Sequence, residues 1–187
     1  MSEFSESFQA YHPDRAPVVA LLRTLGVGGW ILASNARCVS FILDDPEREA
    51  DVLAASRGVL ARYYYGEDHG LWVRFYLDGE QLTAIALVWD SDAGGVQEEQ
   101  EEVEPAARIV AKLAHAGVLG EAEATELRRV LEAFSPEDPG SREHAVEAIP
   151  RLLGFPASTW LSAAYVQETE PEDLRELFPG AEVVEVG

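Results

Sequence analysis

The feature that most constrains the fold is a series of three β-rich runs joined by short turns. The runs cover residues 59–65, 71–77 and 81–89, and Asp78-Gly79 separates the last two. Asp-Gly between two β-rich runs is the strongest short-range signal of a hairpin. The three runs therefore predict an antiparallel meander.

Large side chains fall on both faces of this predicted meander, because bulky residues occupy odd and even positions alike. Helices of the same chain could cover both faces, or one face could present an aromatic surface to a partner. We select bulky residues of the second and third runs as candidate protein-binding residues. They are Trp72, Arg74, Tyr76, Ile85, Leu87 and Trp89.

Helical and strand signals flank the meander on both sides. Apolar spacing and helix start signals predict helices over 14–25, 46–57, 105–117 and 121–134, and β-rich runs at 30–34 and 37–43 predict a hairpin. The expected class is therefore α+β. It would have an N-terminal helix, an antiparallel twisted sheet of about five strands with flanking helices, and a C-terminal helical extension.

The domain organisation follows from these signals. Residues 1–13 carry no periodicity and are expected to fray. Residues 14–134 are expected to form the α+β domain, and residues 135–187 a mainly helical C-terminal extension. A chain of 187 residues suits this plan, because it can bury one sizeable core and carry an appended element.

The charge balance restricts the partners of this chain. Fourteen basic and 34 acidic residues give a net charge of −20, so a phosphate backbone would repel the molecule and we expect no direct nucleic-acid binding. The charge could steer the chain toward a basic protein, or it could simply keep the chain soluble. Lys112 is the only lysine, which we attribute to the base composition of the genome.

Targeting signals and multi-cysteine sites are both missing from the sequence. No apolar stretch reaches the roughly 18 residues that a spanning helix needs, and the N-terminal region resembles no signal peptide. We therefore expect a cytoplasmic protein that does not bind membranes. Cys38, the only cysteine, lies in an apolar run and is expected to be a buried, inert thiol.

The sequence contains no established catalytic or nucleotide-binding motif. It has no nucleophile elbow, no phosphate-binding loop and no zinc-protease motif, and its four histidines are scattered. Glu67, Asp68 and His69 share one predicted turn and could bind a cation or act as an acid–base group, but charged turn residues are usually solvated. We therefore expect no enzyme, no catalytic residues and no cofactor.

The acidic segment after the third run contains a pattern that resembles a calcium loop. Asp90, Asp92, Glu98 and Glu101 fall at positions one, three, nine and twelve of such a loop. Gly94 stands at position five, where Asp or Asn is preferred, and a predicted strand precedes the loop in place of a helix. An acidic, solvated linker is the alternative interpretation.

One stretch of the sequence resembles a known family. The matching residues are Arg74, Tyr76, Leu77, Asp78, Gly79, Gly94, Gly95 and Val96. In this order they resemble the bacterial YbjN-like family, and the resemblance covers roughly residues 14–117. That family is similar in fold to the small acidic dimeric chaperones of type III secretion. The resemblance implies a homodimer with a protein client and supplies no active-site residues.

Three functional hypotheses follow from the sequence. The first is a non-enzymatic adaptor or chaperone-like dimer that binds a protein client, for which a basic nucleic-acid-binding protein would suit the acidic surface. The second is an acidic inhibitor or immunity-type protein that mimics phosphate and blocks a basic surface. The third is a metal-dependent or hydrolytic enzyme, which would need a pocket where Glu67, His69 or other titratable groups converge.

Overall fold

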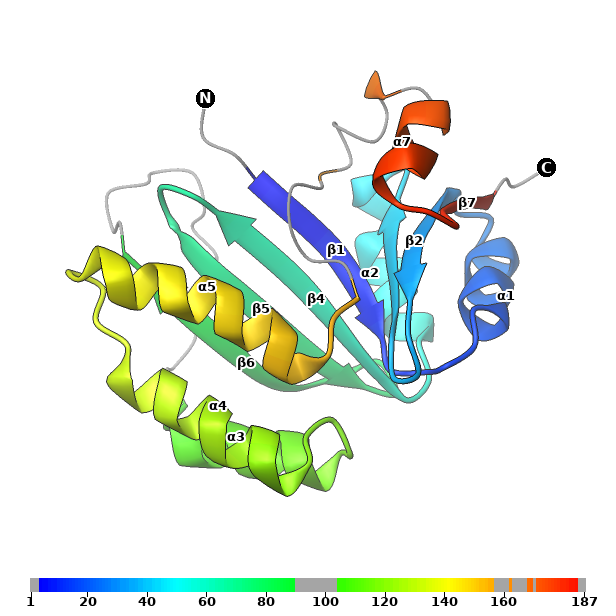
Figure 1. The fold of residues 1–187 in the computed structure, drawn as a ribbon. Coiled ribbons are helices and arrows are strands. Elements are labelled where there is room, and N and C mark those ends of the chain that lie inside the picture. The colour runs from blue at the N-terminus through cyan, green and yellow to red at the C-terminus, as the bar shows by residue number, and fades with distance from the viewer. Residues whose placement is uncertain (1–3, 90–103, 157–161, 163–167, 170, 185–187) are drawn as a thin grey trace.

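The protein folds around one antiparallel sheet (Figure 1), in a computed structural model that describes residues 4–89, 104–156, 162, 168–169 and 171–184. The α+β class is confirmed, and the described residues form seven strands where about five were expected. Their order across the sheet is β6-β5-β4-β1-β3-β2-β7. The strands are β1 (Phe4–Ala10), β2 (Gly29–Ser34), β3 (Val39–Leu43), β4 (Val59–Gly66), β5 (Gly70–Leu77), β6 (Glu80–Val88) and β7 (Glu182–Val184).

The predicted meander is present as β4, β5 and β6, each paired antiparallel with the next. Asp78 and Gly79 form the turn between β5 and β6 with φ angles of 52° and 87°. Positive φ at both positions is the backbone that Asp-Gly supplies most readily in a two-residue hairpin. The sequence signal for this hairpin is therefore confirmed.

Helices cover both faces of the sheet (Figure 1). Within the described ranges, every helix is too short or too polar to cross a lipid bilayer. The helical segments are α1 (Ala16–Leu25), the short 3-10 turn η1 (Pro46–Arg48), α2 (Glu49–Ala55), α3 (Ala106–His115), α4 (Glu121–Ala133), α5 (Pro139–Leu153) and α7 (Pro171–Leu177).

Three apolar cores hold these layers together. One core packs α1 and α2 against β1, β2 and β3, another packs α3, α4 and α5 against β4, β5 and β6, and a smaller one packs α7 against β2 and β3. Leu60 belongs to the first core and its neighbour Ala61 to the second. Because successive residues of a strand point to opposite faces, these two helical layers lie on opposite sides of the sheet.

The expectation that residues 1–13 fray is wrong for residues 4–10, which form β1 in the middle of the sheet. β1 pairs with β4 on one side and with β3 on the other. Ser5, Ser7 and Gln9 alternate with the residues that face α1, and all three polar residues are buried. A buried strand face made of polar side chains carries no apolar periodicity, so the sequence pattern concealed this strand.

A hydrogen-bond network compensates for burying these polar groups. The Gln9 amide donates to Ser7 Oγ at 2.8 Å, and Ser40 Oγ donates to the Gln9 carbonyl oxygen. Cys38 lies beside the same carbonyl and is buried, as expected, and burial raises the pKa of its thiol to about 12. These hydrogen bonds offset the cost of burial, since an unpaired buried polar group costs about 1–3 kcal/mol.

The expected boundary at residue 134 does not separate two cores. Helix α5, which falls in the expected extension 135–187, contributes Ala148, Ile149 and Leu153 to the core that α3 and α4 share. Strand β7 joins the sheet next to β2. The described elements of the expected extension, α5, α7 and β7, are therefore built into the same layers as the rest.

Candidate functional site

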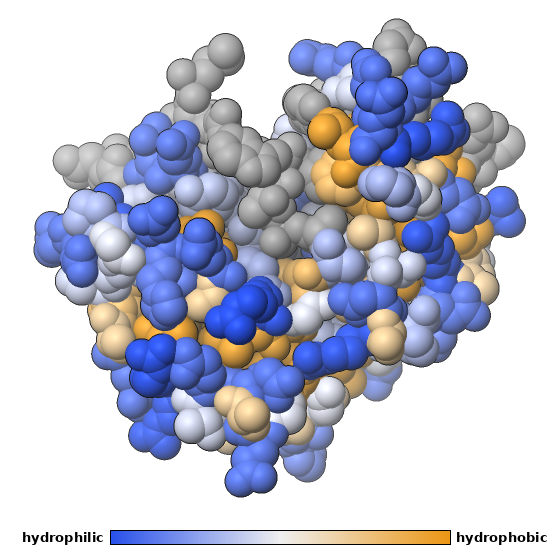
Figure 2. Space-filling model, viewed as in Figure 1, coloured by the Kyte–Doolittle hydropathy of each residue, from blue (hydrophilic) through white to orange (hydrophobic). Residues whose placement is uncertain are grey.

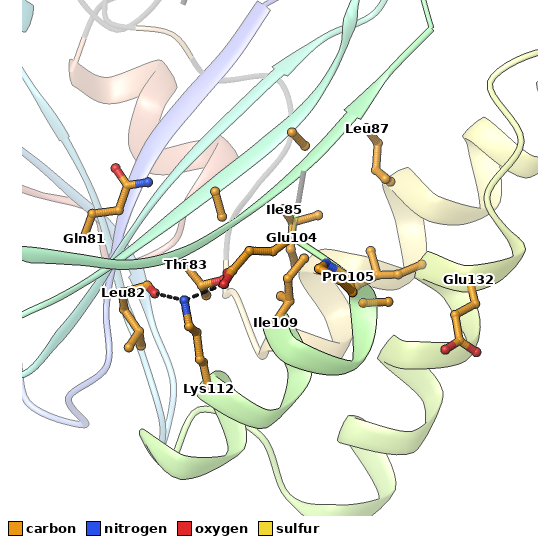
Figure 3. Close-up of a pocket in the computed structure, with 14 residues that line it drawn as sticks. Gln81, Leu82, Thr83, Ile85, Leu87, Glu104, Pro105, Ile109, Lys112 and Glu132 are labelled. Carbon is orange, nitrogen blue, oxygen red and sulfur yellow. Dashed lines mark hydrogen bonds and ion pairs between the residues drawn. The ribbon is translucent and has the colours of Figure 1, made fainter. Parts of the chain in front are cut away.

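A groove of about 620 Å³ runs beside β6, the strand at one edge of the sheet (Figure 3). Its volume lies within the range of about 300–1,000 Å³ that is usual for ligand sites. Strand β6 forms one wall, and the start of α3 and the end of α4 form the other. The lining residues are Gln81, Leu82, Thr83, Ala84, Ile85, Ala86, Leu87, Glu104, Pro105, Ala106, Ile109, Lys112, Leu131 and Glu132.

The edge of β6 presents a row of main-chain groups. Within the described residues β6 pairs with β5 alone, and the N–H of Trp89 donates to the carbonyl of His69 at 3.1 Å. Because hydrogen-bonding residues alternate in an antiparallel pair, Thr83, Ile85 and Leu87 bond to β5 in the same way as Trp89. The N–H and C=O groups of Ala84, Ala86 and Val88 therefore point away from β5, and Ala84 and Ala86 line the groove.

One end of this edge is closed by polar side chains. Lys112 Nζ donates to the carbonyl of Leu82 at 2.9 Å and to Glu104 Oε1 at 2.6 Å (Figure 3). Thr83 Oγ1 donates to the other carboxylate oxygen of Glu104, and Arg108 Nε lies 3.0 Å from Oε1. The hydrogen bond from Lys112, joined by that from Thr83, lowers the pKa of the Glu104 carboxyl.

A β-bulge positions this polar end. The register shifts between the pairs Phe75↔Thr83 and Tyr76↔Gln81, so Leu82 is an extra residue on β6. A bulge turns neighbouring side chains to a new direction. Figure 3 shows the result: Leu82 and Thr83 lie on the side of α3, whereas Gln81 points away from it.

The remainder of the groove is apolar. Ile85 and Leu87 of β6 form its floor and are only 1% and 7% exposed, and Ile109 of α3 and Leu131 of α4 contribute to the opposite wall. Small residues such as Ala86 leave the backbone edge accessible. An apolar wall beside an open strand edge is the geometry that receives an extended peptide, whose alternate side chains enter the groove.

The structure divides the six candidate protein-binding residues between the two faces of the sheet. Trp72, Arg74 and Tyr76 lie half-buried on the face of β5 turned away from α3, α4 and α5, and the Trp72 ring packs 5.5 Å from Tyr64. Ile85 and Leu87 lie on the opposite face, in the core beneath the helices. Residue bulk alone could not separate these faces, because a strand buried on one side and half-buried on the other is bulky on both.

Trp89, the sixth candidate, lies where β6 meets α5. Its ring centroid is 6.4 Å from that of Phe134, and its indole N–H donates to the carbonyl of Glu67 at 3.0 Å. A hollow of about 290 Å³ beside it is lined by Glu67 and Arg142 among others, but not by His69. This hollow therefore does not bring Glu67 and His69 together.

The candidate calcium ligands Asp90, Asp92, Glu98 and Glu101 lie outside the described residues. In the ranges that the structure does describe, no group of three or more His, Cys, Asp or Glu side chains could hold a metal ion. The candidate functional site is therefore the groove beside β6.

Sequence reasoning missed the polar end of the groove. Lys112 is the only lysine in a chain that otherwise uses arginine, and this could have been the signal, since a compact ammonium on a flexible stem can bond a carbonyl and a carboxylate together. Glu104 could not be singled out from the sequence, because the chain has 34 acidic residues.

Hydrophilic and apolar residues are unevenly distributed over the visible face (Figure 2). Figure 2 shows that hydrophilic residues dominate the helical layers, with apolar residues gathered between α4 and α5 and beside α7. Leu177 of α7 is 56% exposed, but single exposed apolar residues are normal on protein surfaces. The groove differs from them because it combines apolar walls with main-chain groups of β6 that have no strand partner among the described residues.

No family model, no curated protein and no solved structure matches this chain. The resemblance to the YbjN-like family stays a prediction.

Proposed function

We propose that this protein is a non-enzymatic cytoplasmic adaptor that binds an extended segment of a client protein as an added strand on β6. The observation that carries the proposal is the outer edge of β6 at Ala84, Ala86 and Val88, which pairs with no further strand in the part of the chain that the structure describes and lies next to an apolar groove. Main-chain hydrogen bonds would supply affinity, and the groove would select side chains.

The length of the open edge sets the size of the bound segment. Lys112 already donates a hydrogen bond to the carbonyl of Leu82. A client strand can therefore pair with β6 from Ala84 to Val88. Five residues of a strand span about 17 Å. The client segment is therefore short, and its affinity depends on how well its apolar side chains fill the space between Leu87, Ile109 and the neighbouring walls.

Charge favours a client with basic flanks. The acids that line the groove already have partners, because Glu104 pairs with Lys112, and Glu132 with Arg128 at 2.7 Å. The surplus of acids is spread over the rest of the chain, whose net charge is −20. Such a field speeds the approach of a cationic segment and excludes acidic ones, which is consistent with a basic nucleic-acid-binding protein as client.

The test uses a fluorescein-labelled peptide of alternating valine and threonine with lysines at both ends. Fluorescence anisotropy should show saturable binding, and the same peptide with glutamates in place of the lysines should bind at least about tenfold more weakly. Two further versions carry N-methyl groups on either the valines or the threonines. One version should lose binding, because only one set of N–H groups faces β6.

The matching protein variant is Ala86→Pro, which removes an outward N–H without breaking a hydrogen bond to β5. Peptide affinity should fall about tenfold, the equivalent of one or two lost hydrogen bonds. Ala111→Ser, on the exposed side of α3 and outside the groove lining, serves as the control. Equal binding of all peptides would overturn the proposal.

A second copy of this chain is the competing occupant of the edge, since the family resemblance implies a homodimer. Light scattering on the wild type and on Ala86→Pro distinguishes the two occupants. If the wild type is a dimer that Ala86→Pro dissociates, and if no peptide binds, then β6 is a dimer interface and the client proposal is wrong. If β6 is instead the client site, the protein binds the peptide whether it is a monomer or a dimer.

A further inference from the structure

A second cavity, of about 420 Å³, lies on the other face of the sheet from the groove. It is bounded by α1 and by the connection from α2 into β4. The lining residues are Ala10, Tyr11, His12, Pro17, Val18, Ala20, Leu21, Thr24, Leu25, Phe41, Ala55, Ser56, Arg57, Gly58, Val59 and Leu60.

The body of this cavity is hydrocarbon. Phe41 and Leu60, both fully or almost fully buried, belong to the core beneath it. Leu21 and Leu25 line it from α1 and are only partly buried. Apolar side chains that are left partly exposed around a hollow gain free energy when an apolar group fills it, at about 25 cal/mol per Å² covered.

The cavity differs from the rest of the surface in its charge. None of its lining residues is acidic, although 34 of the 187 residues of the chain are. Arg57 is the one lining residue with a permanent charge, and His12 is the other lining residue that can carry a positive charge. In a molecule with a net charge of −20, the cavity is therefore a local site where an anion would contact positive groups and no lining carboxylate.

The guanidinium of Arg57 still has N–H donors for an anionic ligand. Its partners within the described residues are two carbonyl oxygens, those of Ser56 at 2.8 Å and Ala55 at 3.5 Å. A guanidinium has five N–H donors in a planar fork that suits a carboxylate. The side chain is exposed, so a ligand can reach it from solvent.

Two acids that bond to the backbone at or beside the cavity are already engaged by main-chain N–H groups. Asp14 accepts a hydrogen bond from the N–H of Ala16 at 3.0 Å, at the start of α1. Asp78 accepts one from the N–H of Gly58 at 2.8 Å. Neither carboxylate lines the cavity, so neither competes inside it for Arg57.

From these contacts we infer that the cavity binds a small amphipathic anion, with its hydrocarbon body against α1 and its carboxylate at Arg57. The class of ligand is a free carboxylic acid with an aliphatic chain. The site is independent of the proposed strand addition, because it shares no lining residue with the groove.

The test measures displacement of 8-anilinonaphthalene-1-sulfonate, itself an amphipathic anion, from the purified full chain. Decanoate should displace the dye, and decanol and decylamine, of equal chain length, should do so at least about tenfold less well. Leu21→Trp, which fills the cavity, should abolish dye binding, provided that circular dichroism shows a folded protein.

The decisive comparison is between two arginine variants. Arg57→Gln should weaken decanoate about tenfold and leave decanol unchanged, whereas Arg23→Gln, an exposed arginine of α1 that does not line the cavity, should change neither. Decanoate and decanol binding equally well to the wild type, or an equal loss in both variants, would overturn the inference. A failure to displace the dye would overturn it as well.

Discussion

The two edges of the sheet are built in different ways. β7 is three residues long, carries the exposed Glu182 and borders the small core beneath α7. β6 is nine residues long, and from Ala84 to Val88 it carries no charge. Short length and charge are the usual protections of an edge strand against unwanted pairing. The protein uses them at β7, whereas at β6, within the described residues, the bulge and Lys112 protect one end alone. This difference is the basis of the proposed strand addition at β6.

Core substitutions at the two edges should have the largest and most unequal effects. Ile85→Ala on β6 should lower the free energy of unfolding by about 2–5 kcal/mol, because it leaves a cavity beneath α3 and α4. Val183→Ala on β7, where the side chain is only partly buried, should cost about 1 kcal/mol or less. Urea unfolding followed by circular dichroism measures both. Equal losses would show that the two edges are equally anchored.

Removing the protection at the polar end of β6 should have an intermediate effect. Lys112→Met takes the main hydrogen-bond donor from Glu104 and from the carbonyl of Leu82, and should lower the free energy of unfolding by about 1–3 kcal/mol. The control is Arg108→Met, whose guanidinium is mostly exposed, with an expected loss below about 0.5 kcal/mol.

The same variant should show a pH dependence of known sign. The pKa of Glu104 is lowered in the folded state, so its carboxylate contributes stability above the unfolded pKa of about 4.3, and this is lost as pH falls through the folded pKa. The difference between wild type and Lys112→Met should therefore be largest near neutral pH and shrink in acid. A difference that stays constant with pH would contradict the ion pair.

The smallest effect is on amide exchange, which should alternate along β6 without any change in stability. In hydrogen exchange followed by NMR, the outward amides should exchange at least about tenfold faster than the amides bonded to β5. The fast set is Ala84, Ala86 and Val88, and the slow set is Thr83, Ile85 and Leu87. In β4, which has a strand on each side, the amides of Ala61, Arg62 and Tyr63 should all be slow. Uniform protection along β6 would show that its edge is already covered.

Local signals explain which parts of the fold could be predicted. The meander was expected at 59–65, 71–77 and 81–89 and is present with ends shifted by one residue at most, because alternation and an Asp-Gly turn are encoded within a few residues. β1 escaped prediction, because its buried face is polar and its partners, β3 and β4, are distant in sequence.

The groove could not be predicted from the sequence, because it is a tertiary feature. Chain order does not reveal that β6 is an edge, and the contact of Lys112 with Leu82 joins residues thirty positions apart. The candidate residues chosen by bulk included Ile85 and Leu87, which form the floor of the groove from within the core. Bulk identifies a buried strand face, but it does not identify the accessible backbone beside it.

The position of β1 also has a consequence for the order in which the fold assembles. β2 with β3, and β4 with β5 and β6, are hairpin-connected neighbours that can pair over short loops. β1 alone joins these two groups, with partners up to about sixty residues away. Pairings of such high sequence separation form slowly, because a long loop must close first. The sheet is therefore expected to grow as two separate ribbons that become continuous when the N-terminal strand inserts between them.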